Sequence, residues 1–164
     1  MKNKPISNRL YGLIVLYEMH TDFLIRALDG LTDEDAQKRM DTEANHIAWI
    51  TGSIVAGRYE MAKSLGVNLT ATTGALFVEH KGIQEGVTYP TLDAFKKDWE
   101  AISPVLQKTL TEATDEKIDE PFVMPGMEMK LFDMIAFNTY REANCIGQIA
   151  LWRRLLGYKG MSYM

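Results

Sequence analysis

The chain has 164 residues, of which 46% are hydrophobic and 24% are charged, and we expect one globular domain over residues 1–164. The formal net charge is -4 and the basic residues are scattered, which argues against nucleic acid and membrane surfaces as partners. No segment approaches the roughly 20 apolar residues of a membrane span, and the start of the chain lacks a signal-peptide pattern, so we expect a cytoplasmic protein.

Apolar spacing predicts two long helices in the first half of the chain. From roughly Asn8 to Leu28, apolar residues recur at spacings of three and four. Thr32 followed by Asp35 has the form of a capping box and predicts a short helical turn. The second long helix is expected to end at Leu65, before Gly66. Its candidate N-caps are Asp41, Thr42 and Asn45.

The pattern then predicts a long crossover from Gly66 to Pro90 that holds a helical turn, and two further helices. The third helix starts near Thr91, and Pro104 inside it should kink it. Pro125-Gly126 suits a type II turn and predicts a small hairpin between Glu120 and Met129. The last helix spans roughly Lys130 to Leu156. The fold class is therefore all-α, a four-helix bundle with a long crossover between its second and third helices.

The last helix carries polar side chains where an ordinary bundle has Leu or Ile. Residues at helical spacing that we expect on its inner face are Met134, Asn138, Arg141, Cys145, Gln148, Trp152 and Leu155. On the second helix, His46, Ser53 and Gly57 interrupt the apolar face, and His20 lies in the stripe of the first helix. This polar seam either satisfies itself internally or serves a ligand.

Several seam residues allow two readings. A buried Arg141 needs an anion, which is Glu142, Glu60, another carboxylate of the chain, or a bound acid. A cation one turn before Cys145 would favour its thiolate and suit a nucleophile, whereas free cysteine is more often an inert buried residue. His20 and His46 fit core or cap roles better than ligand roles. Four methionines either fill gaps or rim an apolar entrance: Met124, Met127, Met129 and Met134.

Two segments carry a family resemblance. Asn45-His46-Ile47-Ala48-Trp49-Ile50-Thr51-Gly52-Ser53 and Arg141-Glu142-Ala143-Asn144-Cys145-Ile146-Gly147-Gln148-Ile149 resemble the helix-two and helix-four motifs of the DinB and YfiT superfamily of four-helix bundles. Arg153-Arg154-Leu155-Leu156-Gly157 continues the similarity. The resemblance covers essentially the whole chain.

The resemblance implies a divalent metal, commonly zinc or nickel, held by three histidines, and activity as a thiol-dependent transferase or isomerase. In this sequence the three ligand positions are Ser53, Arg141 and Cys145. Arg141 keeps its proton and repels a cation, so we predict no metal and no cofactor. The alternative is a rearranged zinc or nickel site that combines His46 or His20 with Cys145, although His46 precedes the usual position by two turns, about 10 Å.

These observations leave three hypotheses for function. The first is a non-metal protein that binds a small anionic or polar ligand through Arg141, with Asn138, Gln148, Ser53 and His46 around it. The second is a thiol-dependent transferase or isomerase with a rearranged metal site. The third is a structural bundle that works as a homodimer.

Overall fold

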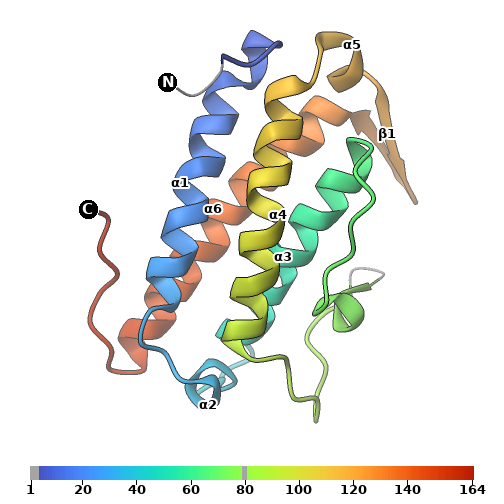
Figure 1. The fold of residues 1–164 in the computed structure, drawn as a ribbon. Helices are drawn as coiled ribbons and strands as arrows, with labels where there is room; N and C mark the ends of the chain where they lie inside the picture. The colour runs from blue at the N-terminus through green and yellow to red at the C-terminus, as the bar shows by residue number, and fades with distance from the viewer. Residues whose placement is uncertain (1–3, 79–80) are drawn as a thin grey trace.

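The computed structural model describes residues 4–78 and 81–164, so residues 79 and 80 of the expected crossover lie outside it. Four long helices form the bundle (Figure 1): α1 (Tyr11–Leu28), α3 (Ile47–Ser64), α4 (Leu92–Glu112) and α6 (Leu131–Leu155). Shorter elements join them: the 3-10 turns η1 (Asn8–Leu10) and η2 (Gly74–Leu76), the short helices α2 (Asp33–Ala36) and α5 (Asp115–Ile118), and the strands β1 (Pro121–Met124) and β2 (Met127–Lys130). The predicted all-α bundle is confirmed. Among the described residues no helix is long and apolar enough to cross a membrane.

Interhelical contacts fix the direction of each helix relative to its neighbours. His20 of α1 meets Glu142 of α6, and the carbonyl of Ala27 accepts from Arg153 further along both helices, so α1 and α6 are parallel. Residues 52 and 58 of α3 lie beside residues 95 and 103 of α4, so this pair is parallel too. Since α3 and α4 are consecutive long helices, a parallel arrangement requires the long crossover that the sequence predicts.

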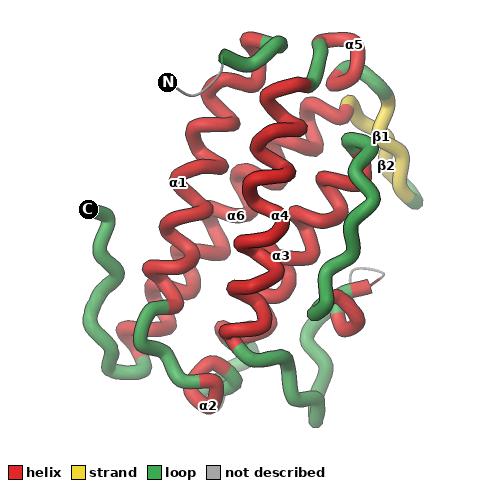
Figure 2. Tube along the Cα trace, viewed as in Figure 1, coloured by secondary structure: helices red, strands yellow, loops and turns green. Residues whose placement is uncertain are grey.

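The crossover returns along the outside of the bundle from the end of α3 to the start of α4, as Figure 2 shows. Asp98 of α4 anchors it, because its carboxylate accepts hydrogen bonds from the backbone N–H and the hydroxyl of both Thr72 and Thr73 at 2.6–3.1 Å. Further along, the Phe77 ring packs directly over Gly52. The Asp98 carboxylate and the space above Gly52 thus hold a segment that has little regular structure of its own.

Side-chain caps define most helix starts. Thr32, Thr91 and Thr114 each accept a hydrogen bond from a backbone N–H three residues later. The prediction that α3 starts at Asp41, Thr42 or Asn45 was wrong. The N-cap is His46, whose Nδ1 accepts from the N–H of Trp49 at 3.1 Å. The neutral imidazole offers the same acceptor as a Ser or Asn cap.

Helix ends and the hairpin follow the glycine signals. Gly66 adopts a φ of +93° just after α3, which confirms the predicted stop. Gly126, with a φ of +79°, forms the turn between β1 and β2, which confirms the predicted hairpin. The α4 helix continues through Pro104.

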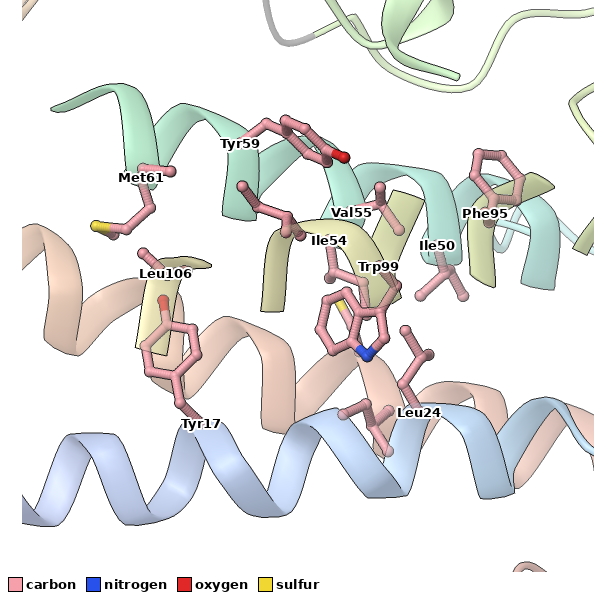
Figure 3. Close-up of a cluster of buried hydrophobic side chains, with 14 of the residues drawn as sticks. Tyr17, Leu24, Ile50, Ile54, Val55, Tyr59, Met61, Phe95, Trp99 and Leu106 are labelled. Carbon is pink, nitrogen blue, oxygen red and sulfur yellow. The ribbon is translucent and has the colours of Figure 1, made fainter. Parts of the chain in front are cut away.

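The core lies along the bundle axis. Figure 3 shows the Trp99 ring between α3 and α1, with Ile50 and Leu24 close to it. Trp99, Phe95 and Ile54 are each at most 1% exposed. Burial on this scale supplies the main driving force for assembly, because roughly 25 cal/mol is gained for each Å² of apolar surface removed from water.

Candidate functional site

A cavity of about 350 Å³ lies between α3, α6, the hairpin and the crossover. The α3 wall consists of Trp49, Ser53, Ala56, Gly57 and Glu60. The α6 wall consists of Met134, Phe137, Asn138 and Arg141. Phe77 and Lys81 of the crossover close a third side. The volume equals that of about a dozen water molecules at ~30 Å³ each, so the cavity suits a small organic molecule.

The hairpin covers the cavity with thioethers. Met124 pairs with Met127 across the turn, and Phe122 pairs with Met129. Directly paired residues of an antiparallel ladder, and residues two apart on one strand, share a face, so the three methionines point the same way. Met134 joins them from the first turn of α6, and all four line the cavity. The structure therefore places these four methionines around the cavity, in agreement with the predicted apolar rim.

Arg141 contributes a positive charge to the α6 wall of this cavity. Its side chain is half-buried, and Nη1 donates to the backbone carbonyl of Ser53 at a long 3.3 Å. A guanidinium has five N–H donors. Within the described part of the chain, this is the one hydrogen bond that the Arg141 side chain makes, and no carboxylate pairs with it.

Gly57 makes the space that Arg141 occupies. A Cβ at this position would lie 3.1 Å from Arg141 Nη1 and 3.7 Å from Asn138 Oδ1. Ser53 and Asn138 also line the cavity, but their side-chain donors already make hydrogen bonds within their own helices. Ser53 Oγ donates to the carbonyl of Ile50 at 2.9 Å, and Asn138 Nδ2 donates to the carbonyl and the sulfur of Met134. On the α3 and α6 walls, the donors without a partner among the described residues are therefore those of the Arg141 guanidinium and the indole N–H of Trp49, which is itself buried.

Comparisons with known proteins add no constraint to this geometry. No protein-family model, curated protein or solved structure matches this chain. The site must therefore be interpreted from its own residues.

Three of the predicted site residues, Gln148, His46 and Cys145, lie outside the cavity. Gln148 is exposed and donates to Asn144 Oδ1 at 2.6 Å. Leu155, expected on the same inner face, is 54% exposed. His46 is buried at the N-cap of α3, where its ring stacks edge-on against Tyr89 at 5.1 Å. Cys145 and Trp152 of the predicted inner face are buried as expected, but Ile135, Thr139, Glu142 and Ile149 are buried one residue, or about 100°, after the predicted positions.

Cys145 is buried and does not line the cavity. Burial raises the pKa of its thiol, and the nearby Glu142 carboxylate raises it further, while Arg141 acts in the opposite direction. Arg141 does favour the thiolate, as expected, but loss of solvation outweighs it, so of the two readings of Cys145 the inert buried residue fits better. A protonated, enclosed thiol is a poor nucleophile.

The rotated face of α6 brings Glu142, not Arg141, into the core. There it meets Arg58 of α3, which is 1% exposed. Arg58 Nε and Nη2 donate to the two carboxylate oxygens at 2.7 and 2.8 Å, a bidentate pair. Nη1 donates to Thr21 and Ser103, and Nη2 also donates to the carbonyl of Tyr17. All five N–H donors of Arg58 therefore have acceptors.

Two more groups complete this buried network. The Arg58 guanidinium lies over the Trp99 ring at 3.4 Å, and His20 Nδ1 lies 3.2 Å from Glu142 Oε2. Burial alone would raise the pKa of Glu142, but the charge and hydrogen bonds of Arg58, together with His20, hold it below its usual value. His20 thus belongs to a core network and not to the cavity.

Sequence reasoning missed Arg58, although a signal was present. The apolar stripe of α3 runs through Ile54 and Met61, and Arg58 occupies the position between them. On α6, Glu142 interrupts the buried stripe of Ile135 and Ile146 in the same way. One cation and one anion that interrupt two facing stripes indicate a buried ion pair.

The residues at the three positions that the family resemblance assigns to a metal do not fit one. Ser53 Oγ is bonded to its own helix, Arg141 is cationic, and Cys145 keeps its proton. Over residues 4–78 and 81–164, no group of three or more His, Cys, Asp and Glu side chains is arranged to hold a metal ion. In the alternative of a rearranged site with Cys145, one ring nitrogen of each histidine already has another partner: His46 Nδ1 caps α3 and His20 Nδ1 pairs with Glu142.

Proposed function

We propose that this protein is a DinB-like four-helix bundle that binds a small anionic ligand through Arg141, in the cavity between α3, α6 and the hairpin. The observation that carries the proposal is the difference between two arginines. Arg58 has an acceptor for every donor, whereas Arg141 faces a cavity with one long hydrogen bond and no described anion partner. A partly desolvated guanidinium gains most from a charge-assisted hydrogen bond to an anion.

Site-specific NMR tests this proposal directly. The Nε–Hε signal of Arg141, assigned by its absence in Arg141→Met, is followed while acetate, phosphate and small organic acids are added at constant ionic strength. We expect a saturable shift with at least one anion. Charge-assisted hydrogen bonds are each worth about 1.5–3 kcal/mol, so Arg141→Met should weaken binding by about 10-fold or more.

The matched control is Arg154→Met, which removes the same charge from an exposed position of the same helix. It should bind every anion as the unaltered protein does. Equal weakening in both variants would mean that only the overall charge matters. No saturable shift with any anion would contradict the proposal.

A second candidate, a homodimer, is favoured by the outer face of α1 and α6. Leu16 and Met19 of α1 are 41% and 43% exposed, and Tyr140 and Leu151 of the neighbouring α6 are 65% and 59% exposed. The exposed α6 positions from 137 to 151 carry no charge. A two-fold interface sets a surface against its own copy, so a stretch of α6 without exposed charges is compatible with itself.

Sedimentation velocity tests this candidate. We expect a dimer that Leu151→Asp converts to a monomer, because the interface would then bury a charge in each copy. Val123→Asp, an exposed apolar position on the hairpin, is the control and should leave the dimer intact. A monomer at high protein concentration would exclude the homodimer and leave the ligand proposal unaffected.

A further inference from the structure

We infer that the ligand of this cavity is a monocarboxylate with an aromatic body, which rests on the proposed function and narrows it to one chemical class. The charge of Arg141 gives the first reason. Its half-buried guanidinium carries one positive charge and has no carboxylate partner among the described residues, so one carboxylate neutralises it. A phosphate ester dianion would bring a second negative charge into a cavity that Glu60 also lines.

The supply of donors gives the second reason. A carboxylate has two oxygens, and one planar guanidinium can satisfy both with a pair of parallel hydrogen bonds. A phosphate presents three oxygens and needs donors from several directions. Ser53 and Asn138, the polar neighbours of Arg141, have already committed theirs to α3 and α6, and Asn138 Oδ1 is an acceptor that repels an anion.

The apolar walls of the cavity indicate the chemistry of the uncharged part of the ligand. Three aromatic rings line the cavity, those of Trp49, Phe77 and Phe137. The thioethers of the hairpin and of Met134 face the same space. Sulfur packs favourably against the edge of an aromatic ring at about 5 Å, and the unbranched methionine side chain adapts to a flat partner. A ring on a short acid therefore matches both the charge at Arg141 and the surface around it.

Four probes separate the parts of this inference: phenylacetate, its neutral amide phenylacetamide, acetate, and inorganic phosphate. Each is titrated into the folded full-length protein at constant ionic strength, with the Arg141 Nε–Hε signal and calorimetry as readouts. We expect phenylacetate to bind at least about 10-fold more tightly than acetate, because the buried ring adds apolar contact. Phenylacetamide should bind about 10-fold or more weakly than phenylacetate, because it has no charge.

Two variants locate the ligand. Gly57→Ala places a Cβ 3.1 Å from Arg141 Nη1 without changing any charge, so it should weaken phenylacetate binding by displacing the guanidinium. Arg141→Lys keeps the charge but loses the planar fork, and should also weaken it. Arg154→Met is the control and should bind as the unaltered protein does. A thermal melt of each variant confirms that it is folded.

The outcomes are distinct. If acetate or phosphate binds as well as phenylacetate and Arg141→Met abolishes both, the aromatic carboxylate is excluded and the proposed anion site stands. If phenylacetamide equals phenylacetate, the carboxylate is not recognised and this inference fails. If none of the probes binds, this inference fails, and the wider anion series described above decides whether the proposed function fails with it.

Discussion

Replacing each of two arginines by methionine should separate the bundle's structural charge from its ligand-binding charge. Arg58→Met removes the cation that is 1% exposed and bound to Glu142, and Arg141→Met removes the cation that lines the cavity. The two substitutions are chemically identical and both lie in α3–α6 contacts. Only their surroundings differ.

The surroundings predict very different losses. Arg58→Met leaves the Glu142 carboxylate buried, with His20 as its one remaining side-chain partner among the residues that the structure describes. Breaking one side of a buried ion pair costs about 3–5 kcal/mol, a large fraction of the 5–15 kcal/mol that stabilises a typical domain. Arg141→Met gives up one long hydrogen bond and places a thioether among thioethers, so we expect a change within about 0.5 kcal/mol.

Urea unfolding followed by far-UV circular dichroism measures both changes. With a slope of about 2 kcal/mol per molar urea, the loss in Arg58→Met lowers the unfolding midpoint by about 1.5–2.5 M. The double variant Arg58→Met/Glu142→Leu removes both charges and should recover much of that loss, because no buried charge is left unpaired. Similar midpoints for Arg58→Met and the unaltered protein would refute the argument, as would an equal loss in Arg141→Met.

Three further predictions test single contacts. Gly52→Ala would place a Cβ 2.1 Å from the Phe77 ring, so it should lower the free energy of unfolding by about 1–3 kcal/mol despite the better helix propensity of alanine. Adding Phe77→Leu should recover part of this loss. A Gly52→Ala variant that is more stable than the unaltered protein would contradict the packing. Burial, aided by Arg39, lowers the pKa of His46 from 6.5, so the unfolded chain binds more protons and the free energy of unfolding should fall as pH drops below about 6.5. His46→Asn keeps an N-cap acceptor and should flatten that slope, and an unchanged slope would assign it to another group. Asp98→Asn weakens the hydrogen bonds that Asp98 accepts from Thr72 and Thr73 of the crossover. Limited proteolysis should therefore cut residues 66–90 faster, while the circular dichroism spectrum stays helical. Equal cleavage rates would show that these hydrogen bonds do not hold the crossover in place.

The bundle could be predicted from the sequence because each long helix carries an apolar stripe of several turns. Gly66, Thr91 and Gly126 also mark boundaries by local backbone chemistry, which does not depend on the rest of the fold. The start of α3 could not be predicted in this way. Asp41 and Asn45 are better N-caps than histidine in isolation, but Tyr89, far along the chain, packs against His46 and fixes the cap there.

The site was harder to predict because α6 has weak amphipathic character. Residues 138, 141, 145 and 148 and residues 135, 139, 142 and 146 are both plausible inner faces, and the two differ by about 100°. Arg58 decides between them, since a buried guanidinium on α3 needs a carboxylate and Glu142 is the one that α6 can supply. The pattern of α6 alone could not choose between the two faces, because the choice depends on considering its interruption at Glu142 together with that of α3 at Arg58.

The same pairing explains why the cavity lies where it does. By drawing Glu142 inward, Arg58 sets the rotation of α6 about its axis, and this rotation leaves Arg141, one residue earlier, at the edge of the α3–α6 contact. Gly57, adjacent to Arg58 in sequence, leaves the space that the Arg141 side chain enters. The double variant Arg58→Met/Glu142→Leu removes the ion pair and should still fold into the same helices. We expect it to bind anions at Arg141 more weakly, because α6 would be free to rotate about its axis.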